Sequence, residues 1–159
     1  MTPVKRVLVP VDLDEGSRRS IEYALSIVEP SGGSVDVVYV WEPPKLVRPD
    51  LMVYLNADGQ AMTLAEFTQN QARADLAKVV TEVAPDRANV SAQVVLGSPA
   101  QQILQLSKTG DYDLLVMGTR GRTGLSRALL GSVAEKVVRL ATCPVLVIPT
   151  GAAEPSGGA

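Results

Sequence analysis

The sequence contains no histidine and only one cysteine, Cys143, among its 159 residues. Without histidine neither a Ser-His-Asp triad nor a Cys-His pair can be assembled, which excludes enzymes that depend on those devices. A single cysteine excludes an intramolecular disulfide, and a zinc site lacks its usual ligands. We interpret Cys143, which lies between a predicted helix and a predicted strand, as a small core residue rather than a reactive thiol.

Long apolar runs and clusters of like charge are also missing. No apolar segment approaches the length needed to cross a membrane. Lys5-Arg6 is followed by a strand pattern rather than by the cleavable apolar region of a signal peptide. The net charge is −2 with no basic run, so there is no electrostatic case for a nucleic-acid partner. We expect a cytoplasmic protein that binds neither membranes nor nucleic acid.

The composition is that of a folded globular protein. Apolar residues make up 46% and charged residues 20% of the chain, which is enough to bury a substantial core. At this length we expect one domain over residues 1–150. Residues 151–159 are Gly, Ala, Ser, Pro and one Glu, and we expect a flexible tail there.

Predicted strands and helices alternate along the chain. Short apolar runs predict strands at 4–11, 34–41, 90–96, 112–117 and 144–149. Apolar residues at helical spacing predict helices between them, one opened by a capping box at Thr63 and Glu66 and another started by Ser98 and Pro99. This alternation indicates an α/β fold with a parallel sheet covered on both faces. Residues 42–59 contain three prolines and are predicted to be a surface excursion.

A glycine-rich loop joins the fourth predicted strand to the helix at 133–141. Gly118 and Gly121 are three residues apart, and Gly131-Ser132 follows after nine more residues. Glycines let backbone N–H groups approach a ligand closely, and a helix N-terminus carries partial positive charge, so the loop suits a phosphate. The alternative is a surface loop whose Ser132 caps the helix, because Ser132 and Glu135 match the capping-box pattern.

This spacing resembles the ATP-binding motif of the universal stress protein family, G-2x-G-9x-G-S/T. Three further stretches match in order: the opening V-L-V-P-V-D, the G-S-P before the third helix and the closing C-P-V-L-V-I-P, so the resemblance covers residues 4–149. It implies a Rossmann-like fold (adenine nucleotide alpha hydrolase-like) with a five-stranded parallel sheet of order 3-2-1-4-5. Such sheets bind ligands at the carboxyl ends of the strands, here between the first and the fourth.

The resemblance also implies roles for individual residues. Asp12 would contact ribose, although it could instead cap a helix, a role that Asp14 could equally fill. The Val40 backbone would contact adenine, and Arg122 would lie near the phosphates unless it is an ordinary solvated arginine. Members of the family often carry a serine or threonine close to the aspartate, whereas here Ser17 comes later. The expected binding residues are Pro10, Val11, Asp12, Val40, Met117, Gly118, Gly121, Arg122, Gly131, Ser132 and Val133.

Other motifs are absent or belong to turns. There is no P-loop and no G-x-G-x-x-G, and Asp111 and Asp113 look like turn residues rather than a catalytic pair. We interpret Gly97 and Pro99 as structural, forming a tight turn into a helix. We expect no catalytic residue and no metal ligand from the protein.

The expected function is that of an ATP-binding stress module. The expected cofactor is ATP, and any Mg or Mn is expected to bind through its phosphates. The resemblance further implies a homodimer formed through residues 144–149, which would otherwise be an exposed apolar edge. Two alternatives stay open: a slow ATP-hydrolysing enzyme that uses the same site, and a family member that binds another ligand such as AMP.

Overall fold

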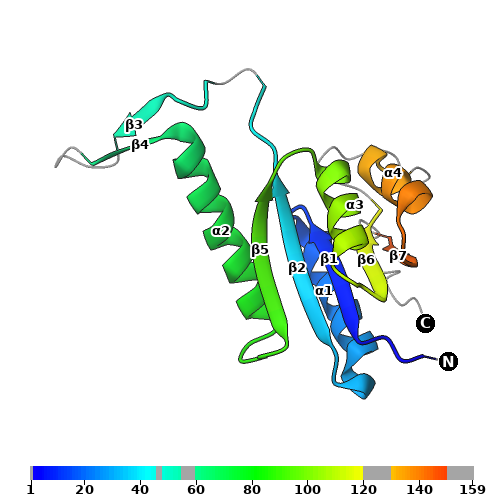
Figure 1. Ribbon diagram of the computed structural model, residues 1–159. Coiled ribbons are helices and arrows are strands. Elements are labelled where there is room, and N and C mark those ends of the chain that lie inside the picture. The colour runs from blue at the N-terminus through cyan, green and yellow to red at the C-terminus, as the bar shows by residue number, and fades with distance from the viewer. Residues whose placement is uncertain (1, 46–47, 55–59, 120–129, 150–159) are drawn as a thin grey trace, which may run out of the picture.

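The protein is an α/β layered structure with one main parallel sheet (Figure 1). A computed structural model describes residues 2–45, 48–54, 60–119 and 130–149. The strands are β1 (Arg6–Val11), β2 (Ser34–Trp41), β3 (Met52–Tyr54), β4 (Ala61–Thr63), β5 (Val90–Leu96), β6 (Leu114–Gly118) and β7 (Val145–Ile148). The helices are α1 (Glu15–Val28), α2 (Leu64–Val83), α3 (Pro99–Thr109) and α4 (Ser132–Leu140), with a short 3-10 helix η1 (Glu29–Ser31) after α1.

The five-stranded sheet has the order β5-β2-β1-β6-β7, and all its strands pair in parallel. This confirms the predicted order 3-2-1-4-5, because β5, β6 and β7 are the third, fourth and fifth of the predicted strands. The bounds of β2 and β5 are those predicted from sequence. The order along the sheet reverses between β1 and β6, which puts the switch point at the carboxyl ends of these two strands.

Each face of the sheet is covered by two helices. Val7 and Val9 of β1 pack with α1 and α2, whereas Leu8 between them packs with α3 and α4. Both faces of a parallel strand are therefore buried, which explains why β1 reads as an almost continuous apolar run. Cys143 is half-buried against the α3–α4 side, in agreement with its interpretation as a core residue.

Helix starts follow local sequence in some places and not in others. Thr63 and Glu66 form the predicted capping box, and Pro99 is the first residue of α3 after Ser98 at the N-cap, although the Ser98 side chain makes no capping hydrogen bond. At α4 the alternative in which Ser132 caps the helix is wrong. Gly131 occupies the N-cap position and Ser132 is already the first helical residue, so the serine side chain cannot serve as the cap.

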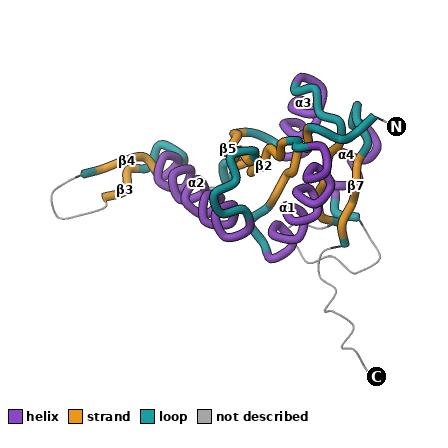
Figure 2. Tube along the Cα trace, turned by 90° about the horizontal axis from the view of Figure 1, so that it is seen from below, coloured by secondary structure: helices purple, strands orange, loops and turns teal. Residues whose placement is uncertain are grey.

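The predicted surface excursion, residues 42–59, includes one strand of a small hairpin that sequence patterns did not reveal, and the second strand follows it. β3 and β4 pair in antiparallel fashion, and β4 leads directly into α2. Figures 1 and 2 both show this hairpin at the far end of α2, away from the main sheet. Three-residue strands are too short for apolar alternation to be recognised.

The two aspartates before β6 are turn residues, as interpreted from sequence. Asp111 adopts a left-handed backbone conformation with φ of 51°. The Asp113 carboxylate accepts hydrogen bonds of 2.9 Å from the backbone N–H groups of Lys5 and Arg6, and so fixes the entry to β1. Within the described ranges no helix is both long and apolar enough to cross a membrane.

Candidate functional site

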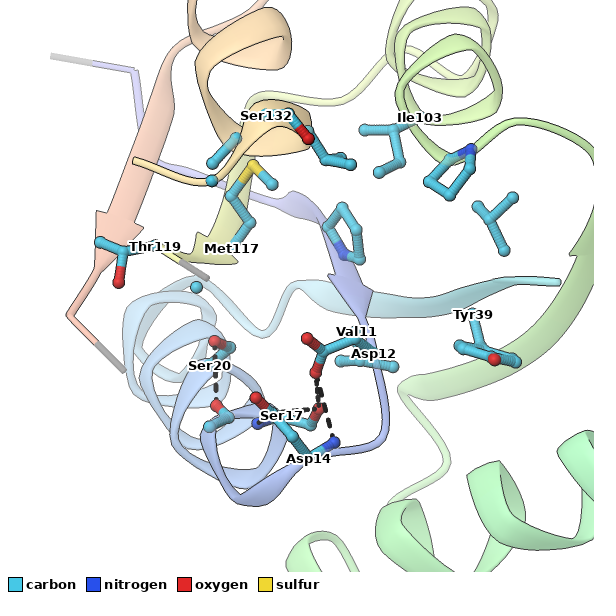
Figure 3. Close-up of a pocket in the computed structure, with 18 of the residues that line it drawn as sticks. Val11, Asp12, Asp14, Ser17, Ser20, Tyr39, Ile103, Met117, Thr119 and Ser132 are labelled. Carbon is cyan, nitrogen blue, oxygen red and sulfur yellow. Dashed lines mark hydrogen bonds between the residues drawn. The ribbon is translucent and has the colours of Figure 1, made fainter. Parts of the chain in front are cut away.

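A cavity of about 450 Å³ lies at the switch point of the sheet (Figure 3). Its walls come from the carboxyl ends of β1, β2 and β6 and from the first turns of α1, α3 and α4. This volume falls in the range of small-molecule sites. The predicted binding residues that line it are Pro10, Val11, Asp12, Val40, Met117, Gly118, Gly131, Ser132 and Val133. Gly121 and Arg122 lie outside the described residues.

The chain turns sharply between β1 and α1. Leu13 has a φ of 66°, a left-handed conformation that is uncommon for a residue with a side chain. On either side of it, Asp12 and Asp14 both line the cavity. The turn therefore places the carboxylates of Asp12 and Asp14 on one wall of the cavity.

The structure gives these two aspartates different roles, which the sequence could not distinguish. Asp14 is the N-cap of α1, and its Oδ1 accepts a hydrogen bond of 3.0 Å from the backbone N–H of Ser17. The Oδ1 of Asp12 accepts from the backbone N–H of Asp14 at 3.2 Å and from the Ser17 hydroxyl at 3.3 Å. Asp12 is thus not the cap of α1, and its carboxylate faces the cavity.

The carboxyl group of Asp12 has a raised pKa. Burial raises the pKa of Asp12 to about 6, and the Asp14 carboxyl adds to the rise through a hydrogen bond and through its charge. Glu42, at the end of β2, is a further carboxylate at the cavity, and the lining residues within the described ranges include no Lys or Arg. The wall formed by Asp12 and Asp14 is therefore acidic and rich in acceptors.

The opposite wall is formed by the start of α4 and the end of β6. Gly131 and Ser132 line the cavity, and no side chain caps this helix within the described residues. The Gly131 N–H donates to the Thr119 carbonyl at 2.7 Å, and the Thr119 N–H donates to the Ile148 carbonyl at 3.0 Å. The two ends of the glycine-rich loop are thereby held together beside the cavity, with the N-terminus of α4 exposed to it.

The remaining lining is largely apolar. Figure 3 shows Ile103 and Tyr39 toward one end of the cavity and Thr119 toward the other, with Asp12 between them. Pro99, at the first position of α3, also lines the apolar end. Its structural role at the helix start is present as interpreted, but its position at the cavity was not foreseen from sequence.

Two serines of α1 were also missed as cavity residues. Ser17 and Ser20 are almost completely buried and line the cavity, although they belong to the first turns of an amphipathic helix. The Ser20 hydroxyl donates to the Gly16 carbonyl at 3.2 Å. The available signal was a pair of polar residues three apart on the face of α1 that otherwise carries Ile21 and Ala24 into the core.

Comparison with known proteins gives evidence that is independent of the cavity. The model of the Universal stress protein family matches residues 3–149. Universal stress protein MJ0531 of Methanocaldococcus jannaschii is 33% identical over 144 residues, which cover 91% of this chain and 81% of that protein.

Solved structures share the fold. A universal stress protein in complex with cAMP superposes with a TM-score of 0.68 at 21% identity, covering 94% of this chain and 100% of the other. The universal stress protein from Archaeoglobus fulgidus in complex with dAMP gives a TM-score of 0.63 at 19% identity, covering 92% and 99%. At this level of identity the likeness concerns the fold.

Proposed function

The chain belongs to the universal stress protein family, and on that basis we propose that it binds an adenine nucleotide, with ATP as the first candidate, in the cavity at the ends of β1, β2 and β6. One observation carries the proposal: a single cavity presents an apolar end, a pair of carboxylates on one wall and, across from them, a helix N-terminus that no described side chain caps. These three environments suit a base, a ribose and a phosphate chain. The cAMP and dAMP complexes of relatives support adenine as the base.

The base would be held by backbone groups at the end of β2. The β1–β2 register ends with Val11 opposite Tyr39, while the Trp41 carbonyl accepts from the Gly97 N–H on the β5 side. Successive residues of a strand direct their backbone groups to opposite neighbours, so the Val40 carbonyl is directed to the β1 side, beyond the last β1–β2 pair. A carbonyl directed there can accept a hydrogen bond from the amino group of adenine.

The sugar and phosphates would lie across the remaining two walls. The Asp12 carboxylate can accept hydrogen bonds from ribose hydroxyls, and the N–H groups at Ser132 and Val133 can donate to phosphate oxygens. Within the described residues there is no group of three or more His, Cys, Asp or Glu side chains placed to hold a metal ion. We propose that any divalent cation arrives bound to the phosphates.

ATP should raise the melting temperature of the protein. At about a hundred times its dissociation constant, a ligand that binds only the folded state adds roughly 2.7 kcal/mol, or roughly 5–10 °C for a chain of this size. Gly131→Val should abolish the shift, because a branched side chain at the helix start would occupy the place of the phosphates. Leu130→Ala is the matched control, since Leu130 is exposed and does not line the cavity. Absence of any shift with ATP, AMP and cAMP would leave only the family and fold.

The same variants distinguish a binding module from a slow ATPase. ATP hydrolysis needs a group that positions the attacking water, and Asp12 is assigned here to the ribose. We therefore expect ATP binding with very slow phosphate release in magnesium or manganese. Turnover of about 1 per second or faster that is lost in Gly131→Val would establish the enzyme instead.

The assembly proposed for this module is a homodimer through β7. This strand lies at an edge of the sheet, and Leu146 in its middle is 36% exposed. Unpaired apolar edge strands associate with other strands unless they are protected. Pairing of two β7 strands across a two-fold axis would protect both at once.

A further inference from the structure

The outer edge of β5 presents backbone groups that the rest of the sheet does not use. The Gly97 N–H, one residue beyond β5, donates to the Trp41 carbonyl of β2 at 3.0 Å. Successive residues of a strand direct their backbone groups to opposite sides, so Ala92, Val94 and Leu96 direct theirs away from β2. Among the described residues none forms a backbone hydrogen bond to them on that side. Each therefore leaves one donor and one acceptor at the edge.

The sequence of β5 lacks the features that usually protect an edge strand. Residues 90–96 include no proline and no charged residue, and either of these would discourage pairing with a further strand. The strand is also long for an edge, with seven residues against four in β7. β5 thus offers the longer edge for pairing with another strand.

A groove of about 360 Å³ lies beside this edge, between β5 and α2. Figures 1 and 2 both show α2 outward of β5, beyond the last strand of the sheet. α2 therefore forms a floor under the position that a sixth strand would occupy. The residues that line the groove are Arg73, Leu76, Ala77, Ala92, Gln93 and Val94.

The groove combines an apolar floor with one cation. Leu76 is buried and Ala77 is small, which leaves room for side chains from above. Arg73 is the one charged residue of the described lining, and its Nη1 donates to Oδ1 of Asn70 at 3.2 Å. No carboxylate of the described residues forms an ion pair with it. Because a guanidinium has five N–H donors, Arg73 can still bind a carboxylate of a partner.

The position of α2 argues against a second copy of the chain as that partner. Antiparallel pairing of two β5 edges across a two-fold axis would put both α2 helices on the same face of the joined sheet. Each α2 lies outward of its own β5, so the two helices would compete for the same space beneath the joined strands. A single extended segment that carries no helix on this face avoids the conflict.

We propose that the β5 edge is a docking site for an extended segment of a partner protein, which pairs with Ala92, Val94 and Leu96 as a sixth strand and places a carboxylate against Arg73. In strand addition the backbone supplies affinity, and alternate side chains supply specificity through the pockets that they enter. Small or β-branched residues on both sides of an acidic residue would match this groove. The groove shares no lining residue with the nucleotide cavity, so the inference does not depend on the proposed function.

The first test uses two synthetic peptides, acetylated and amidated, with the sequences Thr-Val-Thr-Glu-Thr-Val-Thr and Thr-Val-Thr-Lys-Thr-Val-Thr. Calorimetry should show that the wild type binds the glutamate peptide about fivefold or more tightly than the lysine peptide. Arg73→Glu should reverse this order, because the charge of the groove changes sign. Lys78→Glu is the matched control, since Lys78 is an exposed cation of α2 that does not line the groove, and it should keep the wild-type order.

The second test measures amide hydrogen exchange by NMR. The glutamate peptide should slow exchange at Ala92, Val94 and Leu96 by about tenfold or more, because their N–H groups gain acceptors. Exchange at Gln93 and Val95 should change little, because their N–H groups already face β2. This pattern distinguishes strand addition from peptide binding elsewhere on the surface.

Three results would overturn the proposal. The first is no binding of the glutamate peptide at millimolar concentration, or binding without slower exchange at the three edge residues. The second is an unchanged peptide order in Arg73→Glu. The third is slower exchange at the edge that grows with protein concentration in the absence of peptide, which would assign β5 to a second copy. ATP affinity should be the same in the wild type and Arg73→Glu, and failure of both to bind nucleotide would remove the proposed function without affecting this docking site.

Discussion

The Asp12 carboxylate combines a stability cost with the proposed binding role. Its pKa is raised from 3.8 to about 6 in the folded protein, chiefly by burial and then by Asp14. The folded state therefore binds more protons than the unfolded state between these values, and the free energy of unfolding falls as pH rises through this window. Above pH 6 the cost is fully present, so the ionised side chain weakens the folded protein at neutral pH.

Asp12→Asn should therefore stabilise the protein without nucleotide at pH 7.5. The amide oxygen can still accept from Asp14 N–H and from Ser17, while the charge is gone. The full pKa shift corresponds to about 3 kcal/mol, and partial solvent screening reduces the expected gain to about 1–2 kcal/mol. Thermal melts at pH 7.5 should show the gain, and melts near pH 4 should show almost none.

The same variant should bind ATP at least tenfold more weakly, because a hydrogen bond to a charged group contributes about 1.5–3 kcal/mol. A loss of stability at pH 7.5 with unchanged affinity would contradict both roles. It would show that the carboxylate holds the β1–α1 turn rather than the ligand.

Residue type alone could not show which of Asp12 and Asp14 caps α1. Both aspartates stand between an apolar strand and a helix, and either could have been the cap. The assignment depends on the left-handed backbone conformation of Leu13, which the presence of a leucine does not predict. Ser132 is the opposite case: its capping-box pattern was clear, but the helix begins one residue earlier than the pattern requires.

At the scale of elements, a polar cluster joins the strands at the end of the sheet remote from the cavity. Asp36 of β2 accepts hydrogen bonds from Arg6 at 2.9 and 3.1 Å, from Tyr112 at 2.8 Å and from Ser91 at 2.6 Å. One side chain thereby links β1, β2, β5 and the turn before β6. Its side chain is only 14% exposed, so its acceptors are not replaced easily by water.

Asp36→Ala should lower the free energy of unfolding by about 2–3 kcal/mol, because three donors lose their acceptor at once. Urea unfolding monitored by circular dichroism measures the loss. Asp50→Ala is the matched control, because the Arg48–Asp50 pair is exposed and its removal should have no measurable effect. Nucleotide affinity of the folded Asp36 variant should not change, and a large loss of affinity would show that the two ends of the sheet are coupled.

The strands of the main sheet could be predicted from sequence because burial on both faces leaves long apolar runs. The short hairpin outside the main sheet could not. Its strands β3 and β4 have three residues each and pair only with each other among the described residues. The cavity positions of Pro99 and Ile103 were equally hidden, because they depend on where α3 begins relative to the switch point rather than on residue type.

At the scale of the whole molecule, the proposed dimer makes the two sheet edges unequal. Leu146→Lys places a charge on the exposed side of β7 and should convert the homodimer to a monomer. Leu96→Lys makes the same change at β5, the opposite edge, where Leu96 is 50% exposed, and should leave the dimer intact. Sedimentation velocity at micromolar concentration distinguishes these results. A monomeric wild type would contradict the proposal.

The central place of β1 has a consequence for synthesis on the ribosome. β1 can pair with β2 once residue 41 has emerged, but its other edge waits for β6, which ends at residue 118. At 5–20 residues per second this interval lasts roughly 4–15 s, during which the growing chain carries an open strand edge. The cavity at the switch point is completed later still, when α4 leaves the exit tunnel. The proposed nucleotide would then bind only chains whose translation has passed this point, after the open edge of β1 has been paired.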